Sequence, residues 1–180
     1  RVNGRGPFRF VLDTGSAVSA VSRFLAGELR LPAAAAPSGP VVLQGSTGAM
    51  SAERVVAKRV SVAGCSRERW TMIVLPDASI ADAEGVLGGD FLYRQRLDLR
   101  FGAGLFTLGA AAGSAAATPD EIRLEALSTA RRFANLLGVR GAILMQRGRS
   151  PRPVGVQAIL DTGSQRTVGN AALRRALGLD

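Results

Sequence analysis

The tetrapeptide Asp-Thr-Gly-Ser occurs twice in the chain, at residues 13–16 and again at residues 161–164. Each copy follows an apolar stretch, residues 10–12 in the first case and 158–160 in the second, and each precedes a helix-compatible segment. An apolar stretch that ends on a polar turn is typical of a β-strand entering a loop. Internal duplication is the simplest explanation of two copies with matching flanks. The sequence therefore predicts two related units, each with one carboxylate at the end of a strand.

Composition excludes several classes of enzyme. The chain has 180 residues, of which 47% are apolar, and this is sufficient for one large or two small cores. It contains no histidine and a single cysteine, Cys65. A Ser-His-Asp triad, a Cys-His pair, a conventional zinc site and an internal disulfide are therefore excluded. The sequence calls for no metal and no cofactor.

Two further features concern membranes and polyanions. No apolar run approaches the roughly 20 residues that a spanning helix needs, and Arg1 opens into a strand-like stretch without a signal-peptide core.

The net charge is +9, but the arginines are spread along the chain and aromatic residues make up only 5% of it. Such a pattern argues against nucleic-acid binding as the main role. Polyanion binding remains an alternative, and it predicts a steep salt dependence of association.

The order of apolar runs and turn residues indicates three parts. Residues 1–108 have the pattern of a mainly β unit, residues 109–119 are small and punctuated by Gly and Pro as in a linker, and residues 120–180 begin a new set of strands. A helix is predicted at residues 23–30. Strands of the first unit are predicted at residues 8–12, 41–44, 52–57, 59–62, 70–75, 96–101 and 105–108.

A β-hairpin is predicted between the strands at residues 41–44 and 52–57. Two glycines close to the end of the first strand allow the positive φ values that tight hairpin turns require. Its tip is expected at Gly45, Ser46, Thr47 and Gly48.

The two Asp-Thr-Gly-Ser copies, together with the run Val86-Leu87-Gly88 between them, resemble the aspartic proteases of the pepsin and retropepsin-like clan. The resemblance is to bacterial two-lobe proteins of the retropepsin-like aspartyl protease family in particular. In such proteins two Asp-Thr-Gly loops meet at a pseudo-twofold axis, and an apolar-apolar-Gly element threads beneath a loop. The resemblance implies mainly β, barrel-like acid-protease lobes, with one complete lobe in residues 1–108 and the start of a second in 120–180. It also implies that the hairpin is a mobile flap that covers an extended peptide substrate.

The resemblance assigns catalysis to Asp13 and Asp161. Two carboxylates about 3 Å apart share one proton, so that one acts as a base and the other as an acid toward a lytic water. This chemistry explains how a chain without histidine can hydrolyse peptide bonds. We therefore expect an aspartic endopeptidase that acts on peptide or protein substrates as a two-lobed monomer.

The resemblance also assigns supporting roles to the other residues of the two loops. Thr14 and Thr162 are expected to hydrogen-bond across the junction. Gly15 and Gly163 are expected to leave room beside the carboxylates, where a Cβ would crowd them. The hydroxyls of Ser16 and Ser164 are expected to bond the outer carboxylate oxygens. Asp90 is interpreted as a capping or loop-bonding residue.

Far fewer residues follow Asp161 than separate Asp13 from Gly88 in the first unit. We therefore expect the polypeptide to continue beyond Asp180, because an open half-sheet would leave unpaired edges. Two alternatives to an intrachain peptidase remain. One is a catalytically inactive, protease-like module that binds a peptide or protein, and the other is a homodimer that pairs Asp13 with its copy. The compartment stays open, since one cysteine fits both the cytoplasm and an exported location.

Overall fold

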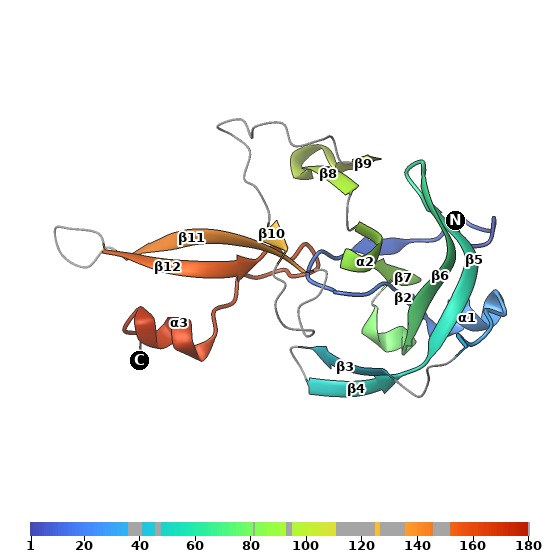
Figure 1. Cartoon of the computed structure of the whole chain (residues 1–180), viewed down its shortest axis with the longest axis horizontal. Coiled ribbons are helices and arrows are strands. Elements are labelled where there is room, and N and C mark those ends of the chain that lie inside the picture. The colour runs from blue at the N-terminus through green and yellow to red at the C-terminus, as the bar shows by residue number, and fades with distance from the viewer. Residues whose placement is uncertain are drawn as a thin grey trace.

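The chain is mainly β in the part that its computed structural model describes (Figure 1). The mainly β class expected from the sequence is therefore confirmed. Within the described ranges the strands form open sheets, and no closed barrel is present. The described residues are 1–35, 41–45, 48–80, 82–92, 95–110, 125–126, 136–145 and 152–179.

A five-stranded sheet organises the first part of the chain. The strand β7 lies between β1 and β2. It pairs in parallel with β1 on one side and antiparallel with β2 on the other. It therefore bridges the two segments that flank the first Asp-Thr-Gly-Ser copy. Along the sheet the strands are β1 (Phe10–Leu12), β7 (Gly85–Leu87), β2 (Ala20–Ser22), β6 (Cys65–Leu75) and β5 (Arg54–Val62).

Two short helices and the sheet enclose a hydrophobic core. The helix α1 (Arg23–Glu28) contributes Leu25, and α2 (Gly89–Leu92) contributes Phe91, which is fully buried. The ring of Phe91 meets that of Trp70 edge to face, with centroids 5.8 Å apart. Each large apolar side chain buried in this way contributes about 1.5–3 kcal/mol. The first part of the chain thus has a core of its own beneath the first loop.

A β-hairpin follows α1, as the sequence predicted. Its strands β3 (Val41–Gly45) and β4 (Gly48–Ala52) are antiparallel, and Gly45 lies opposite Gly48. Gly48 has a φ of +131°, a value that L side chains rarely adopt. Ser46 and Thr47, expected at the tip, lie outside the described residues.

The return strand of this hairpin lies earlier in the chain than the sequence indicated. The prediction that residues 52–57 form the return strand is wrong, because the strand that pairs with β3 begins at Gly48 and ends at Ala52. The strands predicted separately at 52–57 and 59–62 are instead one strand of nine residues, β5. The exposed Lys58 interrupts the apolar pattern there but does not end the strand.

A second hairpin closes the first part of the chain. It consists of β8 (Gln95–Arg100) and β9 (Leu105–Ala110), which pair antiparallel. Residues 109 and 110 were expected to begin the linker but belong to β9, and residues 111–119 lie outside the described residues. Two turns of 3-10 helix lie at Asp77–Ser79 and Phe101–Ala103.

The second part of the chain carries the other Asp-Thr-Gly-Ser copy. A three-stranded antiparallel sheet contains β10 (Glu125–Ala126), β11 (Leu137–Met145) and β12 (Arg152–Ile159), and the short helix α3 (Ala171–Ala176) follows the loop. Figure 1 shows the β11–β12 hairpin extending away from the side occupied by β5 and β6. In the ranges that the structure describes, no helix has the length and apolar character needed to cross a membrane.

Candidate active site

Both Asp-Thr-Gly-Ser copies form a tight turn that orients their aspartate. In the first loop (residues 13–16), Oδ1 of Asp13 accepts hydrogen bonds from the backbone N–H groups of Gly15 and Ser16, at 2.9 and 3.0 Å. In the second loop (residues 161–164), Oδ1 of Asp161 accepts one from the N–H of Gly163 at 2.9 Å. Aspartate favours such turns because its short side chain reaches the backbone two residues on. Each carboxylate is therefore fixed by its own loop.

The similarity of the two copies continues into the helices that follow them. The side chain of Ser22 caps α1 by accepting from the N–H of Leu25 at 3.0 Å. The side chain of Asn170 caps α3 by accepting from the N–H of Leu173 at 2.8 Å. Both helices have six residues, and their caps are separated by the same 148 positions as the two loop threonines. The repetition seen in the sequence is thus repeated in the local hydrogen bonding.

The two threonines bind the loops to each other reciprocally. Oγ1 of Thr14 donates to the carbonyl oxygen of Leu160 at 2.6 Å, and Oγ1 of Thr162 donates to that of Leu12 at 2.6 Å. Each hydroxyl oxygen also accepts the backbone N–H of the other threonine at 3.1 Å. Thr14 is only 2% exposed, so these bonds are formed where water cannot replace them easily. The cross-loop bonds expected from the sequence are present.

The loop glycines allow the two carboxyl groups to face each other. A Cβ on Gly15 would overlap the carboxyl group of Asp161, and a Cβ on Gly163 would lie 2.7 Å from Cγ of Asp13. Each glycine therefore makes room for the aspartate of the other loop. This agrees with the expectation that a side chain at these positions would crowd the carboxylates. The structure shows in addition that a side chain in one loop would crowd the aspartate of the other loop.

The electrostatic environment of the two aspartates differs. Asp13 is half-buried, whereas Asp161 is exposed. Burial raises the pKa of Asp13 above its ordinary value of 3.8, and the negative charge of Asp161 and a hydrogen bond with its carboxyl group raise it further. The backbone N–H groups of Gly15 and Ser16 lower this pKa, but burial is the largest cause. The arrangement favours a protonated Asp13 beside its neighbour.

The loop serines do not act as the sequence suggested. Their hydroxyls were expected to bond the outer carboxylate oxygens. Instead, Oγ of Ser16 donates to the carbonyl oxygen of Val18 at 2.8 Å, and Oγ of Ser164 donates to that of Arg166 at 2.7 Å. Because a hydroxyl has one proton, these hydroxyls cannot also donate to the carboxylates. They stabilise the turns that follow the aspartates.

The strand β7 and the residues after it form backbone hydrogen bonds with the first loop. The N–H of Asp13 donates to the carbonyl oxygen of Leu87 at 3.0 Å, and the N–H of Gly89 donates to that of Ser16 at 2.7 Å. A Cβ on Gly88 would collide with the backbone of residue 18. The apolar-apolar-Gly element therefore lies where the resemblance implied, directly against the first loop.

Ser19 and Asp90 complete this support. The hydroxyl of Ser19, which is 1% exposed, donates to Oδ1 of Asp90 at 2.6 Å and accepts the N–H of Gly88 at 3.1 Å. Oδ1 of Asp90 also accepts the N–H of Phe91 at 2.8 Å. Burial raises the pKa of Asp90. Asp90 is thus a loop-bonding residue, as interpreted. Sequence reasoning missed Ser19, and the one signal for it in the sequence was its position as a polar residue between two apolar residues.

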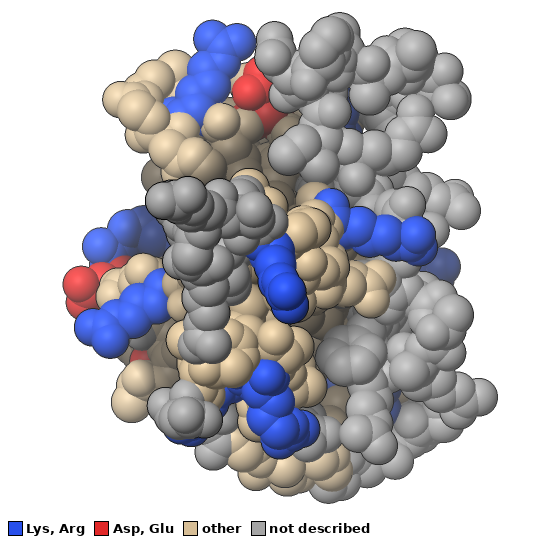
Figure 2. All heavy atoms as spheres, turned by 90° about the vertical axis from the view of Figure 1, so that its left-hand side faces the viewer, with Lys and Arg blue, Asp and Glu red and all other residues tan. Residues whose placement is uncertain are grey.

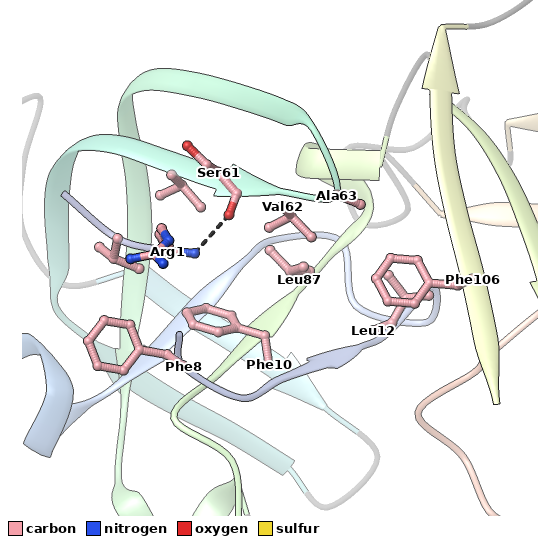
Figure 3. Close-up of a pocket in the computed structure, with 11 residues that line it drawn as sticks. Arg1, Phe8, Phe10, Leu12, Ser61, Val62, Ala63, Leu87 and Phe106 are labelled. Atoms are coloured by element: carbon pink, nitrogen blue, oxygen red, sulfur yellow. Dashed lines mark hydrogen bonds between the residues drawn. The ribbon is translucent and has the colours of Figure 1, made fainter. Parts of the chain in front are cut away.

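A cavity of about 280 Å³ lies against β1 and β7 but is distinct from the paired aspartates (Figure 3). None of its lining residues has a carboxyl group. At one end the α-ammonium group of Arg1 donates to the carbonyl oxygen of Ser61 at 2.8 Å. Its apolar lining includes Phe8, Phe10, Leu12, Leu87 and Phe106.

Comparison with known families bears on the first part of the chain. A family model described as aspartyl protease matches residues 1–91, just over half of the chain. The chain belongs to the aspartyl protease family. The matched residues include the first loop, the β3–β4 hairpin and β7, whereas the second loop lies outside them. No curated protein matches the chain.

Membership of this family implies aspartic-type peptide hydrolysis and a peptide substrate. Among the described residues, no group of three or more His, Cys, Asp or Glu side chains is placed to hold a metal ion. The candidate active site is the junction of the two loops, where the carboxyl groups of Asp13 and Asp161 lie together.

Proposed function

We propose that the protein is an aspartic endopeptidase that hydrolyses peptide bonds with a water molecule activated between Asp13 and Asp161. The observation that carries this proposal is the reciprocal bonding of Thr14 and Thr162, which holds the two aspartate loops of one chain face to face. The raised pKa of Asp13 supports it, because general acid catalysis needs a protonated group. The intrachain pairing also supports a monomer rather than a homodimer built on two copies of Asp13.

The two aspartates take different roles in this proposal. Asp13 is the acid because burial and the neighbouring carboxyl group raise its pKa, and Asp161, the exposed carboxyl of the pair, is the base. Asp161 removes a proton from water while Asp13 donates its proton to the substrate carbonyl oxygen, and the water oxygen bonds to the carbonyl carbon. The C–N bond of the resulting diol then breaks. One carboxyl group protonates the departing nitrogen and the other accepts a proton from a hydroxyl, which leaves a carboxylic acid and an amine.

The proposal gives the β3–β4 hairpin, with Gly45, Ser46, Thr47 and Gly48 at its turn, the role of a flap. Its described side chains are exposed from Gly48 to Ser51, whereas Leu43 and Ala52 pack in one cluster with Ala20 and Ile73. A hairpin anchored at one end and free at the other can cover an extended peptide and pair with its backbone. In the same proposal, residues 1–108 form one lobe and residues 120–180 contribute to a second, with the substrate between them.

Cleavage of a mixed peptide pool between pH 3 and pH 7, with and without pepstatin, tests this function. We expect pepstatin-sensitive cleavage with an acid-shifted optimum. Asp13→Asn and Asp161→Asn should each abolish turnover while the protein stays folded. Asp82→Asn is the matched control, because Asp82 is an exposed carboxylate outside the two loops.

Two outcomes would contradict the proposal. If both loop variants retained turnover, the two aspartates would not be the catalytic pair. If the folded protein bound peptides without cleaving any of them over the whole pH range, it would be a binding module with a protease fold.

A further inference from the structure

The charge of the protein is distributed unevenly around the candidate site. Residues 152–179, which contain the second loop, include four arginines and one carboxylate, Asp161. In the first part of the chain, by contrast, several arginines pair with acidic side chains, as Arg5 does with Glu28 at 2.6 Å. Figure 2, which shows the side of the molecule that is at the left of Figure 1, has basic side chains spread over it and little acidic surface. The segment that carries the second loop therefore has an excess of positive charge.

One arginine belongs to the second loop's own turn. The carbonyl oxygen of Arg166 accepts from the hydroxyl of Ser164 at 2.7 Å, and its N–H donates to the same hydroxyl at 3.4 Å. The side chain is exposed, and no ion pair joins it to the residues that the structure describes. The backbone of Arg166 is thus held close to the catalytic junction while its guanidinium group is available to a ligand.

Comparison with the first loop shows what is unusual at this position. The residue that corresponds to Arg166 is Val18, whose carbonyl oxygen accepts from Ser16 in the same way, at 2.8 Å. The side chain of Val18 is half-buried and packs against a cluster that includes Ala52, at the base of the hairpin. The two loops therefore share a backbone arrangement, but the second presents a cation to solvent where the first presents an apolar contact to the core.

We propose that Arg166 determines specificity, and that its guanidinium group binds a carboxylate side chain of the substrate beside the second loop. Arginine suits this task because its planar guanidinium group matches a carboxylate with two parallel hydrogen bonds. The net charge of +9 assists by attracting acidic segments over longer distances. The protein is thus a peptidase for acidic polypeptide segments, an inference that rests on the proposed endopeptidase function.

The test uses peptides derived from a sequence that the protein cleaves in the mixed pool. Each position flanking the cleaved bond is occupied in turn by Glu, Gln or Lys, and kcat/KM is measured at pH 6, where glutamate is ionised. At one of these positions we expect Glu to be preferred over Gln by up to about fivefold, the size expected of an exposed ion pair, and Lys to be disfavoured. The preference should disappear at pH 3.5, where the glutamate is mostly protonated.

Two arginine variants separate local recognition from bulk charge. Arg166→Gln should bring the Glu-to-Gln ratio close to one. Arg174→Gln removes the same charge from α3, where the Nε of Arg174 donates to the carbonyl oxygen of Leu179 at 3.0 Å, and should leave the ratio unchanged. Equal cleavage of the Glu and Gln peptides at every position, or an equal effect of the two variants, would overturn the inference and leave the endopeptidase function intact. Absence of any cleavage by the folded protein would overturn both.

Discussion

Replacement of Thr162 by valine tests whether the reciprocal threonine bonds hold the two loops together. Valine has nearly the shape of threonine but lacks the hydroxyl. The change removes the bond that Oγ1 donates to Leu12 at 2.6 Å and the bond that it accepts from the N–H of Thr14 at 3.1 Å. Because Thr14 is almost completely buried, its N–H is left without a partner and away from water.

The magnitude follows from these two bonds. Each contributes about 0.5–1.5 kcal/mol net, and a buried group left unpaired adds to the loss, so the loops should be destabilised by about 2–3 kcal/mol. That corresponds to a roughly 30- to 150-fold larger population in which the loops are apart.

Hydrogen exchange of residues 10–16 and 158–164 measures this population directly. Thr162→Val should raise the exchange rates of both segments by the same factor and lower kcat/KM in parallel. Thr162→Ser retains the hydroxyl and is the control, so it should stay close to the parent protein. The reasoning is refuted if exchange in Thr162→Val is unchanged, or if the serine variant is as strongly affected.

Two further predictions concern the carboxyl pair. Gly163→Ala should reduce kcat/KM by more than about a hundredfold, because its Cβ would lie 2.7 Å from Cγ of Asp13 and push the carboxyl groups apart. Gly155→Ala, where a Cβ meets open space, is the control, and equal activity of the two variants would contradict the prediction. The raised pKa of Asp13 means that the folded state holds this proton more tightly than the unfolded state, so its contribution to stability is present at low pH and is lost as the pH rises through that pKa. The free energy of unfolding should therefore fall less between pH 4 and pH 7 in Asp13→Asn than in the parent protein. Urea titrations followed by Trp70 fluorescence measure this free energy at each pH. An equal decrease in the two proteins would contradict the prediction.

Local sequence signals were sufficient to predict the centre of the molecule. The apolar stretches before Asp13 and Asp161 predicted strands that end on loops, and the resemblance of the run Val86-Leu87-Gly88 to a family element implied its place against the first loop. These features depend on short segments whose residue types restrict the backbone strongly. Glycine and aspartate have particular turn geometries, and three consecutive residues define a short buried strand.

Features that depend on distant partners were not predictable in the same way. The strands β5 and β6 extend well beyond their apolar residues because their backbones pair with each other, and exposed residues such as Glu68 take part in that ladder. The strand β4 consists mainly of small residues, which carry little strand preference, and it forms because β3 pairs with it. The directions of the Ser16 and Ser164 hydroxyls depend on which acceptor is nearest in the folded turn, which residue type alone does not specify.

The spacing of the two loops has a consequence during synthesis of the protein. The threonines that hold the candidate site together are 148 positions apart in the chain. A growing polypeptide therefore carries Asp13 long before the ribosome has added its partner, and under the proposed function such an unfinished chain cannot attack its neighbours. Under the same proposal, a cut that released the second loop from the first part would also abolish activity. Under the proposed function, proteolytic activity is then a property of the joined chain that is acquired at a late step of synthesis.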